Sequence, residues 1–122
     1  VSGRPPVFVF GSNLAGRHGA GAALYARQHR GAVYGQGVGR QGDSYAIPTK
    51  DERLVTLSLG GIAAYVGRFL RYAYEHPEER FQVTRVGRGY AGYTDTDIAP
   101  LFAHAPLNCD LPEGWRPCAP ST

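Results

Sequence analysis

The chain has 122 residues, 43% of them apolar, and its 13 basic and 10 acidic side chains give a formal net charge of +3. This length fits one domain with its own hydrophobic core and excludes a two-domain enzyme. The excess of basic residues is small and scattered along the chain, which argues against a nucleic-acid-binding tail or a polybasic membrane segment. Two features are unusual, because 17 residues are glycine and Lys50 is the only lysine among the basic residues.

The first half of the chain is predicted to alternate strands with one helix. Residues 7–10 form a continuous apolar run typical of a strand buried on both faces, and residues 19–29 are predicted as a helix that begins with small side chains. A short strand at residues 32–34 precedes a glycine-rich segment, residues 35–42, that we predict to be a loop. A third strand is predicted at residues 44–48, ended by its proline.

The second half opens with the clearest helix of the sequence. Apolar residues recur at helical spacing over residues 59–75, with Ser58 as the predicted N-cap and Pro77 just past the end. Because β-branched and aromatic residues are frequent in residues 81–86, we predict a strand there.

A second glycine-rich loop, residues 87–93, leads to a third predicted helix that begins at Thr94. Thr94 and Asp97 have the spacing of a capping box, with the aspartate in place of the usual glutamate. Residues 107–111 are predicted as a last strand at the edge of the sheet.

This alternation of strands and helices predicts a single α/β layered domain with a largely parallel sheet. Its core is expected over about residues 7–111, and residues 112–122 are expected to form a tail. In such folds ligands bind where loops leave the carboxyl ends of the strands. Both glycine-rich loops, and the turn at residues 11–18, are predicted to lie at these ends.

The cysteine and histidine residues give no sign of a metal or redox site. Cys109 and Cys118 are nine residues apart without a CxxC motif, and the four histidines lack metal-binding spacing. We expect two free thiols, no metal and a reducing compartment. The apolar run at residues 7–10 is too short for a signal peptide or a membrane span, so the sequence favours a cytoplasmic protein.

Two segments match the G-x-G-x-x-G pattern, residues 37–42 and residues 87–92. Two matches in a glycine-rich chain show that the pattern is weak evidence for a dinucleotide, and the later match is too close to the end to open a doubly wound nucleotide domain. Bare backbone N–H groups next to helix N-termini can nevertheless cradle a diphosphate. The alternative is that these glycines only permit tight turns.

Lys50 and Asn13 are the candidate chemical groups, since each follows a predicted strand. A desolvated lysine amine can attack an electrophilic sugar carbon, although a lone lysine is often only a solvated surface cation. The Asn13 amide can hydrogen-bond a ribose hydroxyl or can equally close a turn.

Four segments together resemble the ligand loops of the macrodomain superfamily: Gly11-Ser12-Asn13, residues 18–23, Ile47-Pro48-Thr49-Lys50, and residues 86–92. The sequence is most similar to the lysine-dependent TARG/DarG-type branch of ADP-ribosyl hydrolases, over roughly residues 7–105. The resemblance implies a compact three-layer α/β/α fold with a mixed, largely parallel sheet.

The resemblance also implies an ADP-ribose site that releases ADP-ribose from a modified acceptor, either DNA or protein. The expected protein is a monomer that uses no cofactor and no membrane partner. Lys50 and Asn13 are the implied catalytic residues. The implied ligand-binding residues are Gly11, Ser12, His18, Gly19, Ala20, Gly21, Thr49, Gly87, Arg88, Gly89, Tyr90, Ala91, Gly92 and Tyr93.

One departure from this family leaves two functions open. Ala91 stands where some members keep an acidic residue, for which Asp95 or Asp97 are the candidate substitutes. Without such an acid, the alternative is a non-catalytic sensor that binds ADP-ribose or a related nucleotide. An acidic residue for adenine is also missing near the first strand, and the candidates for stacking on adenine or covering a ribose are Tyr34, Tyr45, Tyr90 and Tyr93.

Overall fold

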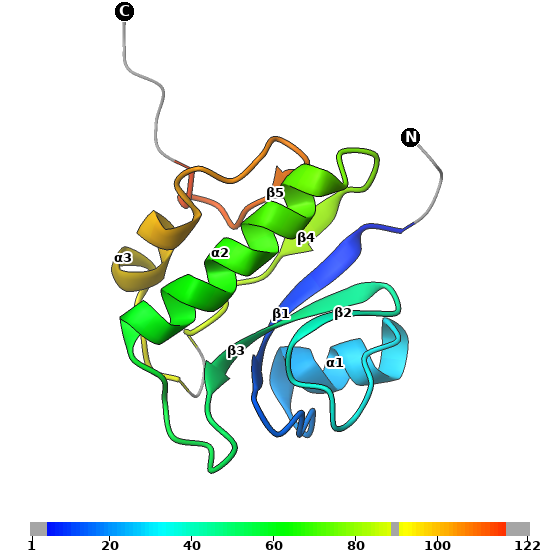
Figure 1. The fold of residues 1–122 in the computed structure, drawn as a ribbon, viewed down its shortest axis with the longest axis vertical. Helices are drawn as coiled ribbons and strands as arrows, with labels where there is room; N and C mark the ends of the chain where they lie inside the picture. Colours follow the sequence, from blue (N-terminus) through cyan, green and yellow to red (C-terminus); the bar gives the residue numbers. More distant parts are fainter. Residues whose placement is uncertain (1–4, 89–90, 117–122) are drawn as a thin grey trace, which may run out of the picture.

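The computed structural model of the protein describes residues 5–88 and 91–116. They form a small mixed α/β domain whose five-stranded sheet has the order β2-β3-β1-β4-β5 (Figure 1). All neighbouring strands are parallel except β2 and β3. The elements are β1 (Val7–Asn13), α1 (Gly21–His29), β2 (Gly39–Gln41), β3 (Ser44–Lys50), α2 (Leu59–Glu75), β4 (Phe81–Val83), α3 (Asp95–Ile98), the 3-10 helix η1 (Ala99–Phe102) and β5 (Cys109–Asp110).

The central strand β1 is buried on both faces, as its apolar run predicts. Side chains alternate between the two faces of a strand. Val7 and Val9 therefore pack in the larger core cluster with residues of α2, whereas Phe8 and Phe10 pack with Ala23 and other small residues around α1. The predicted strand is confirmed and continues to Asn13.

Helix α2 confirms the prediction from helical spacing, with the predicted N-cap. The Ser58 hydroxyl accepts a hydrogen bond from the backbone N–H of Gly61, which satisfies one of the free donors at the start of the helix. The buried face of α2 consists of Ile62, Val66, Phe69 and Ala73.

The strand predicted at residues 32–34 is wrong. Val33 and Tyr34 are exposed, and the backbone N–H of Val33 donates to the side chain of Gln41 rather than to a neighbouring strand. The paired strand is instead β2, inside the segment predicted as a loop. A two-residue turn, Gly42-Asp43, joins it to β3, and Gly42 supplies the positive φ that such turns need.

Strand β3 does not stop at Pro48 but continues to Lys50. Pro48 pairs with Ser12 of β1, and the register shifts directly after this pair. Proline has no N–H to donate and is accommodated within sheets at such irregularities.

Strand β4 is shorter than predicted and ends at Val83, which pairs with Val9 of β1. The backbone N–H and the hydroxyl of Thr84 both donate to the carbonyl of Val9. The third helix starts after Thr94 with the predicted capping box to Asp97, and β5 lies at the sheet edge as predicted.

The end of the described chain is anchored by Trp115, which is buried against Phe102 and donates its indole N–H to Asp95. Cys109 is a buried free thiol, and burial raises its pKa to about 11. Cys118 lies outside the described residues. Within residues 5–88 and 91–116, no helix is both long and apolar enough to cross a membrane.

Candidate functional site

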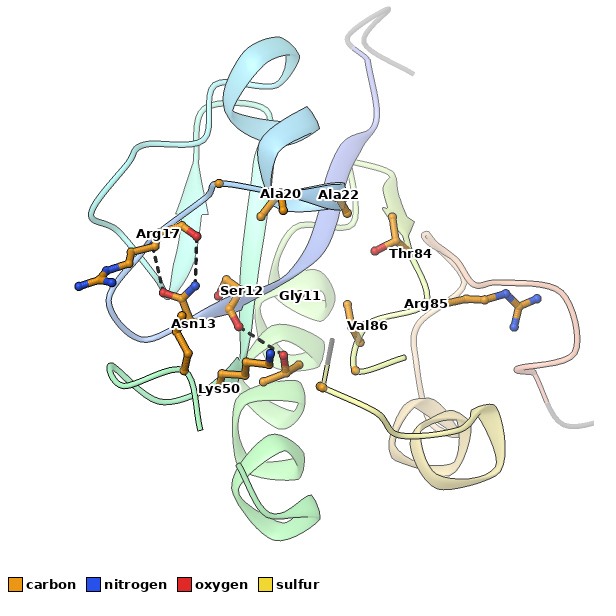
Figure 2. Close-up of a pocket in the computed structure, with 17 residues that line it drawn as sticks. Gly11, Ser12, Asn13, Arg17, Ala20, Ala22, Lys50, Thr84, Arg85 and Val86 are labelled. Atoms are coloured by element: carbon orange, nitrogen blue, oxygen red, sulfur yellow. Dashed lines mark hydrogen bonds between the residues drawn. The ribbon is translucent and has the colours of Figure 1, made fainter. Parts of the chain in front are cut away.

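A cavity of about 520 Å³ opens at the carboxyl ends of β1, β3 and β4, beside the start of α1 (Figure 2). This is the position at which open α/β sheets bind ligands. Its lining comes from four segments that are far apart in the sequence: Gly11, Ser12, Asn13 and Arg17; Gly19, Ala20, Gly21, Ala22 and Ala23; Thr49, Lys50 and Leu54; and Thr84, Arg85, Val86, Gly87 and Ala91.

Asn13 and Lys50 are neighbours across the sheet. Both are the last residues of their strands, they pair in the register of β1 with β3, and the Leu14 N–H donates to the Lys50 carbonyl at 2.9 Å. Parallel strands thus bring together two residues that are 37 positions apart. The half-buried Lys50 side chain extends toward Ser12 (Figure 2).

The Asn13 side chain braces the turn that leads to α1. Its Oδ1 accepts from the Arg17 N–H at 2.9 Å, and its Nδ2 donates to the Arg17 carbonyl at 3.1 Å. A side-chain amide has two N–H donors and two acceptor lone pairs, so one donor and one lone pair are left over from this brace. Both readings of Asn13, as a turn former and as a ligand group, are therefore compatible with the geometry.

The start of α1 presents bare backbone to the cavity. Ala20 is the N-cap and makes no side-chain capping bond, and the first turn holds no acidic residue. Gly21 has a φ of +57°, and a Cβ at either Gly19 or Gly21 would meet nothing within 4 Å. The N-terminal N–H groups of a helix carry partial positive charge, so this edge of the cavity suits an anion.

The opposite wall of the cavity is the segment after β4. It passes close to β1, since a Cβ on Gly11 would lie 3.6 Å from the Gly87 nitrogen. The Arg85 side chain points away from the cavity (Figure 2), where it donates to Asp95 at 2.7 Å and to the Glu113 carbonyl at 3.0 Å. At the Lys50 end, the Thr56 hydroxyl donates to the Ala91 carbonyl at 3.4 Å.

The charged residues of the described cavity lining are all basic. They are Arg17, Lys50 and Arg85, with neither aspartate nor glutamate among them. In Figure 2 the Arg17 and Arg85 side chains point outward, while Lys50 points toward the centre. One ammonium group and a helix N-terminus favour a ligand with negative charge.

His18 does not line the cavity. It is fully buried, its ring packs edge-on against Phe10, and Nε2 lies 2.9 Å from the Gln36 carbonyl and 3.2 Å from the Gln41 side chain. Its Nδ1 has no hydrogen-bond partner in the described structure. His18 therefore belongs to the buried packing around Phe10 and is not part of the cavity wall.

Three other predicted ligand-binding residues lie outside the cavity wall. Arg88 is exposed and pairs with Asp95 at 3.6 Å, and the Tyr93 hydroxyl donates to the Leu57 carbonyl at 2.7 Å. Gly92 is exposed, with a φ of +83°. Gly89 and Tyr90 fall outside the described residues.

The first glycine-rich segment packs behind the site instead of around a ligand. A Cβ on Gly37 would lie only 2.1 Å from the Asn13 carbonyl oxygen, and one on Gly16 would lie 2.3 Å from the backbone of Gly35 and Gln36. These glycines allow two backbone segments to touch. The G-x-G-x-x-G match at residues 37–42 thus has a structural explanation.

The two candidate substitutes for the missing acid are engaged elsewhere. Asp95 is held by Arg85, Arg88 and the Trp115 indole, and the hydrogen bond from this indole is the main cause that lowers its pKa. Asp97 completes the capping box of α3. Neither residue lines the cavity.

Two of the candidate aromatic residues are also placed away from the cavity. Tyr45 is buried in the core against Phe69 and Tyr72, and burial raises the pKa of its phenol. Tyr34 is exposed, with the Arg27 guanidinium over its ring.

Sequence reasoning did not single out Thr84, Arg85 and Leu54 as lining residues. Thr84 and Arg85 were predicted inside a strand that in fact ends at Val83, and Leu54 lies four residues after Lys50 in a segment without a recognised motif. Ala22 and Ala23 also line the cavity, within the helix predicted to begin with small side chains.

Comparison with known proteins adds no neighbour, because no family model, curated protein or solved structure matches the chain. Among the described residues, no three histidine, cysteine, aspartate or glutamate side chains gather as metal ligands would. The functional conclusion therefore depends on the residues of the cavity.

Proposed function

We propose that the protein is an ADP-ribose-binding domain of the macrodomain type that releases ADP-ribose from a modified acceptor, DNA or protein. The packing of α1 and α2 with alternate side chains of β1 supports the corresponding three-layer α/β/α arrangement. The observation that carries the proposal is the pairing of Asn13 with Lys50 at the strand ends, in a cavity that the N-terminus of α1 also lines.

In this proposal the start of α1 binds the diphosphate. The bare N–H groups at residues 19–21 supply hydrogen bonds and partial positive charge, and the segment around Gly87 closes the other side. The free donor and lone pair of Asn13 hold a hydroxyl of the distal ribose. A cavity of about 520 Å³ falls in the range that encloses ligands of this size.

Lys50 supplies the chemistry. Its amine attacks the anomeric carbon of the ribose while the bond from this carbon to the acceptor breaks, and the acceptor leaves with the electron pair of that bond and takes up the proton lost by the amine. Water then adds to the lysine-bound carbon, which releases ADP-ribose and restores the amine. If Lys50 only polarises the anomeric carbon, water attacks that carbon directly and its proton goes to the departing acceptor. No cofactor is needed for this step. The monomer and the cytoplasmic location remain expectations of the sequence.

The second candidate function is a sensor that binds ADP-ribose without turnover. It is favoured by the composition of the described cavity lining, which contains no aspartate or glutamate that could take the place of the acid that some members of the family have. Both functions predict ADP-ribose binding, and only the hydrolase predicts release.

The test is to measure ADP-ribose binding by calorimetry and the release of ADP-ribose from modified DNA and from glutamate-linked peptide. For the hydrolase we expect Lys50→Ala to lower release by about 100-fold or more and to weaken ADP-ribose binding by about tenfold or less. The control is Arg53→Ala, which removes an equal charge from an exposed residue of the same loop that does not line the cavity.

Three results separate the possibilities. Binding without release by the wild type identifies the sensor. Release that survives in Lys50→Ala contradicts the lysine mechanism. Absence of ADP-ribose binding to the wild type contradicts both functions.

A further inference from the structure

Leu54 has a backbone conformation that leucine rarely adopts. Its φ is +63°, and it is the only non-glycine residue with a positive φ in the described part of the chain. The left-handed conformation brings the Cβ of an L-residue close to the following carbonyl oxygen and is unfavourable for leucine. Residues strained in this way are found preferentially at functional sites.

A small hairpin just after β3 imposes this conformation. Lys50 pairs antiparallel with Thr56, and the Asp51 N–H donates to the Val55 carbonyl at 2.8 Å. The Leu54 N–H closes the turn by donating to the Asp51 carbonyl at 3.1 Å. Hairpin loops of this length usually place glycine at the left-handed position.

The Asp51 side chain holds the turn in place. Its Oδ1 accepts from the N–H groups of Arg53 at 2.8 Å and Val55 at 2.9 Å, on either side of Leu54. The hydrogen bonds on both flanks fix the direction in which the Leu54 side chain leaves the backbone.

Core packing does not explain why leucine occupies this position. Leu54 belongs to neither core cluster and is 46% exposed. It lines the cavity with Lys50, among lining residues that are mostly glycine, alanine and polar side chains. The turn thus places the largest apolar side chain of the described lining at the rim, four residues after Lys50.

We propose that Leu54 is a specificity-determining residue that contacts a planar group with an apolar face attached to the ribose, such as a nucleobase, in preference to the small polar ester of a glutamate side chain. This inference rests on the proposed function. If Lys50 acts at the anomeric carbon, the attached group lies at the Lys50 end of the cavity, where Leu54 is. A half-exposed leucine gains free energy by covering an apolar face and gains little by contacting a small polar ester group.

The test compares three ligands in the Lys50→Ala background, which prevents turnover: free ADP-ribose, ADP-ribose linked to a nucleobase, and ADP-ribose linked to glutamate. We expect Leu54→Ala and Leu54→Gly to weaken binding of the base-linked ligand by about fivefold to tenfold. Binding of the other two ligands should change by less than about twofold, because they lack the apolar face. Val55→Ala is the control, since Val55 is the exposed neighbour that does not line the cavity.

A stability measurement separates this role from a structural one. Leu54→Gly relieves the backbone, so its melting temperature should rise by about 2 °C while Leu54→Ala gains nothing. A residue needed only for folding would lose stability and affinity together. Equal weakening of all three ligands, or no weakening, overturns the inference; if the wild type binds none of them, the proposed function fails and the inference fails with it.

Discussion

Gly37 and Gly67 have opposite packing environments, so the same substitution should have opposite effects. A Cβ on Gly37 would lie 2.1 Å from the Asn13 carbonyl oxygen and 3.0 Å from the Leu14 backbone. Gly67 lies in α2, is exposed, and a Cβ there would meet nothing within 4 Å.

We expect Gly37→Ala to lower the free energy of unfolding by about 3 kcal/mol, because the backbone that carries Asn13 must move. Gly67→Ala should raise it by about 0.5–1 kcal/mol, because alanine favours the helix. Guanidinium unfolding of both variants measures the two values. A Gly37→Ala variant as stable as the wild type would show that the segment before β2 does not pack closely behind the site.

At the scale of elements, hydrogen bonds join Arg40 of β2 to Tyr72 in the last part of α2 and to Glu79 in the segment that follows α2. The Arg40 guanidinium makes two hydrogen bonds to the Glu79 carboxylate, at 2.9 and 3.1 Å, and a third to the Tyr72 hydroxyl at 3.0 Å. The Arg40 and Glu79 side chains are only 22% and 16% exposed, so water competes weakly for these bonds.

Glu79→Gln should therefore lower the free energy of unfolding by about 1–2 kcal/mol. The control is Glu75→Gln, which removes the pair with Arg71 on α2, where the side chains are 55% and 81% exposed. That change should cost less than about 0.5 kcal/mol. Denaturant unfolding of both variants at low and high salt is the measurement, and equal costs would mean that the hairpin is held by packing alone.

The accuracy of the sequence predictions depends on how local the determining interactions are. The bounds of α2 and the capping box of α3 follow from residues within one or two turns, and both are confirmed. β2 depends on pairing with β3, which a three-residue segment with two polar residues does not reveal. The Gly42-Asp43 turn was the one local signal for this hairpin.

The same distinction applies to the cavity. The meeting of Asn13 with Lys50 could be predicted, because the ends of neighbouring parallel strands share one edge of a sheet. The sequence could not show which glycine-rich segment lines the cavity and which packs against other backbone. Glycine permits close packing of backbone as readily as it exposes N–H groups to a ligand. Only the tertiary structure shows that Gly37 packs against Asn13 while Gly19 faces open space.

At the scale of the whole molecule, the two faces of the sheet are covered unequally. Among the described residues, α2 contributes on one face to a core of 16 buried residues that includes three phenylalanines, whereas the core around α1 has six, four of them alanine. Helix α1 has nine residues and buries only Ala23 and Ala26. Short helices depend on tertiary packing for their stability, so the α1 side is expected to open first.

Hydrogen exchange followed by mass spectrometry should show this inequality and report on the cavity at the same time. The hydrogen-bonded amides of residues 24–29 in α1 should exchange faster than those in the middle of α2. ADP-ribose at 100 times its dissociation constant raises the free energy of any local unfolding that requires the ligand to dissociate by about 2.7 kcal/mol. Exchange through such unfolding is then about 100-fold slower. Because α1 begins at the cavity, this protection should appear in α1 and leave local openings at the end of α2 near Glu75 unchanged.

The control ligand is adenosine at the same concentration, which has no diphosphate and should protect α1 far less. Equal protection of both helices by ADP-ribose would contradict a diphosphate site at the start of α1.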